Sequence, residues 1–115
     1  MLVPLTFRDK DGFPFTKDGA KVLYARPRGQ SCKLYFEDGT ELEYGYPLNY
    51  FHHEKVWNTN MYRRIDRFLL LKISWLTNRK WLMAILRNGK LLALTKKGNK
   101  RVKKYLEKMK GGQNS

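Results

Sequence analysis

The residues of this chain that could do chemistry are mainly arginines and lysines placed where strands should end or a helix should begin. The run Arg63-Arg64-Ile65-Asp66-Arg67 precedes an apolar segment, and Lys96, Lys97 and Lys100 stand at the start of a helical pattern. A guanidinium can donate two hydrogen bonds to a guanine edge, whereas an ammonium acts as a point charge. These clusters predict contact with a polyanion, although a solvated helix face would also explain the basic residues of the helix.

A second polar segment, residues 26–31, lies earlier in the chain. It carries two arginines, a flexible glycine, Gln30 and Ser31. Arg28 or Gln30 could reach a base edge, but an ordinary polar connection between two strands explains the composition equally well. Asp66 is expected to be an ion-pair partner that orients a neighbouring arginine.

The charge of the chain is concentrated in its second half. The 115 residues carry a formal net charge of +14, yet the first 54 residues hold seven basic and eight acidic groups. From Lys55 onward there are seventeen basic residues, and Asp66 and Glu107 are the only acids. This asymmetry indicates a surface that meets a polyanion, since solubility alone needs a smaller and more dispersed charge.

Few residues have the types or spacing that catalysis or metal binding requires. His52 and His53 are adjacent and Cys32 is the only cysteine, so no metal, cofactor or catalytic triad is expected. A nuclease would need clustered carboxylates for a metal ion, which the second half lacks. No apolar run reaches the ~20 residues of a membrane span, and the N-terminus does not resemble a signal peptide. A single cysteine fits a reducing, cytoplasmic location.

Turn signals divide the chain into short strands. Asp-Gly at 11–12 and 38–39, and Asn-Gly at 88–89, favour the positive φ angles of tight hairpins. We therefore predict hairpins around these three positions, the clearest early one joining 33–36 to 41–44.

The second half should contain a three-stranded meander. We predict strands over 69–75, 81–86 and 91–94, with a turn at Thr77-Asn78-Arg79-Lys80 between the first two. Because Trp75 and Trp81 fall in strand segments, they and Trp57 are expected in the core rather than as stacking platforms.

Two helices are expected among the strands. A short one covers about 47–54, and a longer one follows Thr95, where apolar residues recur with helical spacing. Gly111-Gly112 should end the longer helix, which leaves 111–115 as a flexible tail. The whole chain, 1–115, is then one mainly β domain, with N-terminal strands in 1–20.

Four segments match one family pattern in order. Residues 62–72, Tyr-Arg-Arg-Ile-Asp-Arg-Phe-Leu-Leu-Leu-Lys, follow the pattern F-x-R-I-H-R-S-x-x-V-N, and residues 86–97 follow L-x-n-G-x-x-i-p-v-S-R-r. Residues 21–39, which end in Asp-Gly, and 45–48, which begin with glycine, match its earlier parts. From 21 to 106 the chain therefore resembles the LytTR-type DNA-binding domain of bacterial transcription regulators. Three positions depart from the pattern: the usual His, Ser and Asn are replaced by Asp66, Phe68 and Lys72.

The resemblance implies an elongated, multi-stranded β fold with one short internal helix and a basic C-terminal helix. It implies a non-enzymatic, response-regulator-like protein that binds double-stranded DNA at promoter direct repeats, with loops in successive major grooves. Twenty residues precede the match, so a stand-alone regulator without a receiver domain, or an excised domain, is expected. A homodimer on DNA and a regulatory partner protein are left open. The residues expected to contact DNA are Arg28, Gln30, Ser31, Arg64, Arg67, Lys96, Lys97, Lys100 and Arg101.

A small RNA-binding β domain is the alternative. Such a domain would present aromatic side chains on an open sheet, and Tyr35, Tyr44 and Tyr62 could serve as that platform.

Overall fold

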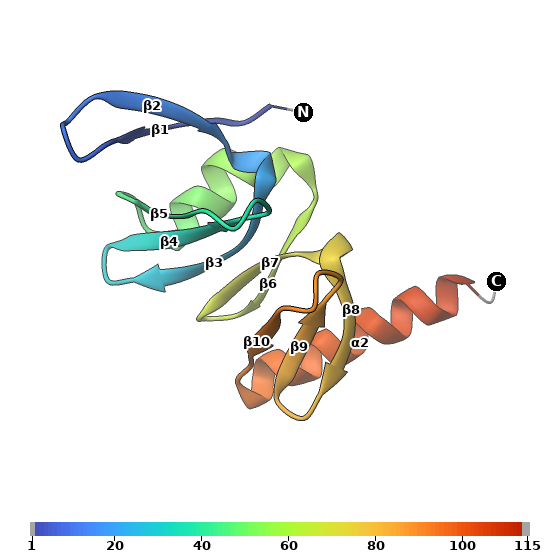
Figure 1. Ribbon diagram of the computed structural model, residues 1–115. Helices are drawn as coiled ribbons and strands as arrows, with labels where there is room; N and C mark the ends of the chain where they lie inside the picture. Colours follow the sequence, from blue (N-terminus) through green and yellow to red (C-terminus); the bar gives the residue numbers. More distant parts are fainter. Residues whose placement is uncertain (1, 114–115) are drawn as a thin grey trace.

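The fold contains three antiparallel sheets, which follow one another in the chain (Figure 1). The computed structural model describes residues 2–113. The outer dimensions are 50 × 28 × 25 Å. A hairpin of β1 and β2 comes first, followed by a five-stranded sheet of order β5-β4-β3-β7-β6 and a three-stranded sheet of order β10-β9-β8. The strands are β1 (Pro4–Arg8), β2 (Pro14–Asp18), β3 (Val22–Arg28), β4 (Ser31–Phe36), β5 (Glu41–Tyr44), β6 (Tyr62–Asp66), β7 (Leu69–Lys72), β8 (Leu76–Lys80), β9 (Met83–Leu86) and β10 (Leu91–Ala93).

Two helical segments complete the fold. The first begins with α1 (Leu48–Tyr50), continues through a π-helical turn, Phe51–Val56, and ends in a 3₁₀ turn, Trp57–Thr59. The second is α2 (Lys96–Gln113), which packs on the three-stranded sheet. Within residues 2–113, no helix is both long enough and apolar enough to cross a membrane.

The end of α2 differs from the prediction. The helix passes through Gly111 and Gly112 to Gln113, because a glycine inside a helix costs only about 1 kcal/mol relative to alanine and does not by itself stop it. The rest of the expected tail, residues 114 and 115, lies outside the described residues.

Strand β7 separates two hydrophobic cores. Leu70 packs in one core, with residues of β1, β3, β4 and the first helical segment. Leu69 and Leu71 pack in the other core, with Leu86 and with Val102 of α2. Because successive side chains of a strand point to opposite faces, a run of three leucines is what a strand buried on both faces requires.

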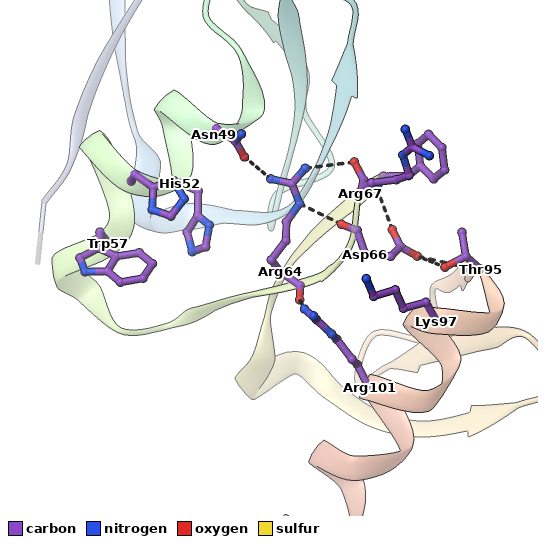
Figure 2. A pocket seen from close by; sticks show the side chains of 11 residues that line it. Asn49, His52, Trp57, Arg64, Asp66, Arg67, Thr95, Lys97 and Arg101 are labelled. Carbon is purple, nitrogen blue, oxygen red and sulfur yellow. Dashed lines mark hydrogen bonds between the residues drawn. The ribbon is translucent and has the colours of Figure 1, made fainter.

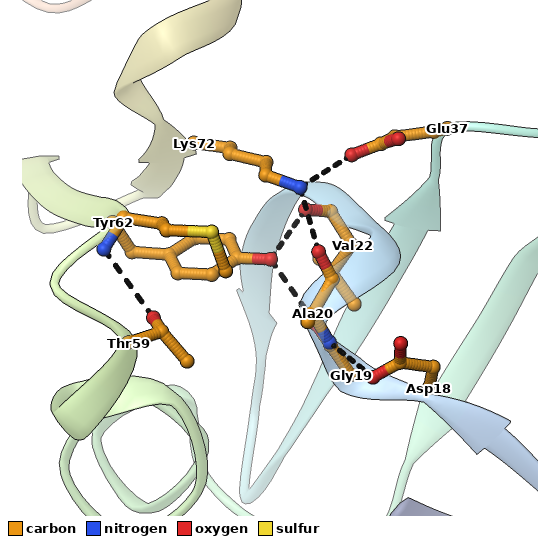
Figure 3. A network of polar contacts seen from close by, with 9 residues as sticks. Asp18, Gly19, Ala20, Val22, Glu37, Thr59, Tyr62 and Lys72 are labelled. Atoms are coloured by element: carbon orange, nitrogen blue, oxygen red, sulfur yellow. Dashed lines mark hydrogen bonds and ion pairs between the residues drawn. The ribbon is translucent and has the colours of Figure 1, made fainter. Parts of the chain in front are cut away.

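A buried polar network joins the start of β3 to β6 and β7 (Figure 3). The Lys72 ammonium donates to the Ala20 carbonyl at 2.6 Å and to the Glu37 carboxylate at 2.5 Å. The Tyr62 hydroxyl lies 2.6 Å from the Val22 carbonyl, and burial raises the pKa of this hydroxyl. Lys72, which departs from the family pattern, therefore has a structural role with its own acidic partner.

The expected strand over 69–75 and turn at 77–80 are wrong in detail. β7 ends at Lys72, the chain turns through a short 3₁₀ segment at Ile73–Trp75, and residues 77–80 belong to β8. The hairpin turn is instead at Trp81-Leu82, since Lys80 pairs with Met83. Polar residues at 77–80 resemble a turn in sequence because this edge strand faces solvent over most of its length.

Two of the three tryptophans do not lie in the core. Trp57 is 57% exposed and Trp81 is 82% exposed. Trp75 is half-buried, with the Arg87 guanidinium 4.1 Å from its ring centroid.

Candidate nucleic-acid interface

The turn between β6 and β7 is held in place by the Arg64 side chain. Its guanidinium donates to the Asn49 side-chain oxygen at 2.7 Å, to the Asp66 carbonyl at 2.8 Å and to the Arg67 carbonyl at 3.0 Å (Figure 2). Burial lowers the pKa of Arg64. All three of its nitrogens are engaged, so Arg64 orients the turn that carries Arg67.

The Asp66 carboxylate binds the start of α2 instead of an arginine. One oxygen accepts from the Phe68 N–H at 2.8 Å, and the other accepts from the Thr95 hydroxyl at 2.8 Å and the Thr95 N–H at 3.3 Å. Among the described residues Asp66 makes no ion pair, so the expected pairing with an arginine is wrong. Its negative charge lies at the positive end of the helix dipole, where it offsets part of the repulsion from the lysines there.

Two residues allow α2 to approach β6 this closely. Thr95 caps the helix, because its hydroxyl oxygen accepts from the Gly98 N–H at 3.0 Å. At position 98 a Cβ would collide with the Asp66 carboxylate and lie 3.1 Å from the Ile65 side chain. Glycine is therefore required for the contact that fixes the helix start next to the β6–β7 turn.

Two basic side chains at this junction remain free. Arg67 and Lys97 are exposed, and within residues 2–113 neither head group has a hydrogen-bond or ion-pair partner. The Arg67 guanidinium lies 5.4 Å from the Phe68 ring centroid. Both line a groove of about 710 Å³ between the first helical segment, the β6–β7 turn and α2. The lining residues are Asn49, His52, His53, Trp57, Arg64, Asp66, Arg67, Phe68, Thr95, Lys97 and Arg101.

Helix α2 contributes the remaining predicted cations. Lys96 and Lys100 are exposed in its first turns. Arg101 also lines the groove and donates to the Arg64 carbonyl at 2.9 Å. The structure thus brings Arg64, Arg67, Lys97 and Arg101 together.

Arg26 joins the predicted 26–31 segment to this region. Its guanidinium donates to the Phe68 carbonyl of the β6–β7 turn at 3.2 Å and to the Ala93 carbonyl at the end of β10 at 3.3 Å. The β3–β4 hairpin, the β6–β7 turn and the start of α2 consequently lie along one side of the molecule (Figure 1). Sequence reasoning included Arg26 in the segment but missed this role, because both acceptors are distant in sequence.

The tip of the β3–β4 hairpin is exposed beyond Arg26. Gly29 has a φ of +63°, as a two-residue hairpin turn requires, and Arg28 and Gln30 are exposed. The Ser31 hydroxyl lies 2.7 Å from the Glu43 carboxylate and 3.0 Å from the Arg28 carbonyl. Ser31 is therefore already engaged within the sheet, whereas Arg28 and Gln30 are available.

The histidines lie on the wall of the groove. His52 is buried, and its ring stacks on His53 at 4.6 Å. Burial, together with the charges of His53 and nearby arginines, lowers the pKa of His52 to about 4. No three His, Cys, Asp or Glu side chains in the described part of the chain are grouped as metal ligands. Cys32 is buried in the first core, which raises the pKa of its thiol to about 12.

The three tyrosines considered for RNA binding do not form an exposed aromatic platform. Tyr44 and Tyr62 are buried. Tyr35 is half-buried and stacks on Tyr24, with ring centroids 4.2 Å apart. This basis for the RNA alternative is wrong, because the rings face the interior or one another.

Comparison with solved structures identifies the fold. The chain is similar to the LytTr DNA-binding domain of a Bacillus cereus protein described as a methyl-accepting/DNA response regulator, with a TM-score of 0.67 and 15% sequence identity. The similarity covers 90% of this chain and 96% of that domain. No protein-family model and no curated protein matches the sequence. The chain therefore has the LytTr fold, and the expected elongated β architecture with a C-terminal helix is confirmed.

Proposed function

We propose that this protein is a non-enzymatic bacterial transcription regulator that binds specific double-stranded DNA along the side formed by the β3–β4 hairpin, the β6–β7 turn and the start of α2. The observation that carries the proposal is a pair of exposed cations, Arg67 and Lys97, which line one groove and have no hydrogen-bond or ion-pair partner among the described residues. The shared fold with a domain described as DNA-binding supports it.

The two cations suit different tasks. Arg67 extends from a turn and can donate two hydrogen bonds to guanine O6 and N7 in a major groove. Lys97, with Lys96 and Lys100, lies on exposed helix positions suited to phosphates, which position a protein on DNA without specifying sequence. Arg28 and Gln30 at the β3–β4 tip provide a second place for base contact.

The molecule is long enough to reach more than one groove of a DNA duplex. Its longest dimension is 50 Å, which exceeds the ~34 Å of one DNA helical turn. We propose that the β3–β4 tip and the start of α2, at the two ends of this basic side, contact neighbouring grooves on the same face of the duplex.

The test is selection of bound sequences from a random pool of duplexes. We expect one enriched motif, and two copies in the same orientation with two chains bound would support a homodimer on direct repeats. Competition at fixed salt between the selected duplex and structured RNA then separates the two nucleic acids. Preference for RNA, or no enriched duplex, would overturn the proposal.

A charge-matched pair of variants tests the location. Replacing Arg67 and Lys97 with alanine should abolish binding to the selected duplex. Replacing Arg8 and Lys10, two cations of the N-terminal hairpin, removes the same charge and should leave binding almost unchanged. Equal losses would show that net charge, not this surface, drives binding.

A further inference from the structure

The turn between β8 and β9 presents a tryptophan that packing within the chain does not explain. Trp81 is 82% exposed and has a φ of +58°. A left-handed backbone conformation is uncommon for a bulky residue. Glycine or asparagine usually occupies a position with such a φ angle. The indole is thus held outward at a position where neither the turn nor the core requires it.

The turn is fastened to the first turn of α2. The Arg79 guanidinium donates to the Trp81 carbonyl at 3.2 Å and to the Asn99 side-chain oxygen at 3.3 Å. The Asn99 N–H in turn donates to the Thr95 carbonyl at 2.8 Å. The β8–β9 turn therefore lies next to the start of α2, at the end of the basic side described above (Figure 1).

The segments that form and flank the turn carry basic residues and no acidic ones. No acidic residue occurs from Arg67 to Leu106, and Lys80 beside the tryptophan is exposed. Leu82, Met83 and Leu91 are also partly exposed on this sheet, as in a surface that binds protein. Continuity with the cations of α2 and the absence of acidic residues from this stretch of sequence favour a polyanion over a protein.

We infer that the β8–β9 turn is a further DNA-contacting element, in which the Trp81 indole packs into the minor groove beside the major groove that Arg67 contacts. Lys80 contacts the flanking phosphates. Apolar side chains enter the minor groove as wedges between base steps and distort the duplex there. This inference rests on the proposed DNA binding and adds a contact at the outer end of the site.

A substitution that preserves the backbone tests the contact. Asparagine tolerates the left-handed conformation, so Trp81→Asn should keep the melting temperature while it weakens binding to the selected duplex about tenfold, the loss expected for one stacked aromatic group. Trp81→Phe should lose less. Phe13→Ala removes a similarly exposed ring, 69% exposed, from the N-terminal hairpin and should change nothing.

A spectroscopic readout locates the indole. The chain has three tryptophans, so 5-fluorotryptophan labelling gives three ¹⁹F signals, of which Trp81→Phe identifies one. Addition of the selected duplex should shift or broaden that signal. If wild-type protein binds the duplex while Trp81→Asn binds equally and the signal does not move, this inference fails and the proposed function stands. If wild-type protein binds no duplex, both fail.

Discussion

Arg64 and Arg67 are three residues apart and chemically identical, yet their surroundings give them opposite roles. Arg64 is half-buried and all of its nitrogens are engaged within the protein. Arg67 is exposed, with no hydrogen-bond partner among residues 2–113. A guanidinium already satisfied by carbonyls would have to break those bonds before it could contact a base. Under the proposed function, Arg67 is accordingly the residue available for recognition, and Arg64 positions the turn that carries it.

Replacement of Arg67 by alanine should weaken binding to the selected duplex by about 1–3 kcal/mol and relax preference at one base pair. Titration of the selected duplex and of single-base variants measures both effects. Lys10→Ala, at the far hairpin, serves as the control. An equal loss on random duplex would mean that Arg67 contacts only phosphate.

Lys97→Ala should act differently, because an ammonium is expected to neutralise a phosphate. The slope of log K against log salt concentration should become shallower by ~0.9 for one lost phosphate contact. The measurement is a series of DNA titrations at several salt concentrations. Preference among sequences should not change, and an unaltered slope would refute the role.

At the scale of elements, local signals predicted more of the fold than of the site. Asp-Gly and Asn-Gly mark three hairpins correctly, since Gly12, Gly39 and Gly89 all have positive φ angles. The Trp81-Leu82 turn was missed because tryptophan is a strand-forming residue that rarely adopts the left-handed φ it has here.

The role of Asp66 could not be predicted, for a similar reason. Its partner Thr95 is 29 residues away, and only the packing of α2 on β6 brings the two together. The neighbouring arginines made an ion pair the natural expectation, yet their guanidiniums lie elsewhere. Clusters of charged residues in the sequence indicated the correct turns. Which residue of each cluster bonds within the protein and which stays exposed depends on tertiary contacts.

Gly98→Ala should destabilise the protein although alanine favours helices by about 1 kcal/mol. The added Cβ collides with the Asp66 carboxylate, so α2 must shift or the carboxylate must turn away from Thr95 and lose its hydrogen bonds there, at a net cost of about 1–3 kcal/mol. Chemical denaturation measures the change in free energy of unfolding. Lys103→Ala, on an exposed position of α2, should cost less than about 0.5 kcal/mol.

A second background distinguishes this collision from a general effect of the substitution. If the carboxylate is the obstacle, Gly98→Ala should cost less in an Asp66→Ala chain than in the wild type. If the destabilisation by Gly98→Ala is the same in both backgrounds, the Asp66 carboxylate is not the obstacle.

For the whole molecule, the charge asymmetry and the interface do not coincide. The second half supplies the excess of positive charge, but Arg26 of the first half ties the β6–β7 turn to the end of β10. The near-neutral half also supplies Asn49, which holds Arg64. The proposed DNA-binding surface is therefore built by both halves, and its geometry depends on the stability of the complete fold.

That stability should depend on pH through His52. The folded protein holds this ring neutral, with a pKa of about 4, whereas the ordinary pKa of a histidine is 6.5. Below pH 6.5 the unfolded chain therefore binds a proton that the folded protein does not. The free energy of unfolding should fall as the pH falls from 6.5 to 4, by up to about 1.4 kcal/mol per pH unit.

The loss of stability caused by His52 occurs at a higher pH than the loss caused by carboxylates. A matched pair of histidine variants then assigns it to one ring. The pKa of Asp38 is lowered from 3.8 to about 2, so its contribution is present above pH 3.8 and is lost only as the pH falls below that value. Between pH 4 and 6.5, denaturation of His52→Gln should show a flatter dependence than the wild type. His53→Gln, at the exposed neighbour, should retain the wild-type slope. A slope that survives in His52→Gln but disappears in His53→Gln would assign the proton to the wrong ring and contradict the buried, neutral state of His52.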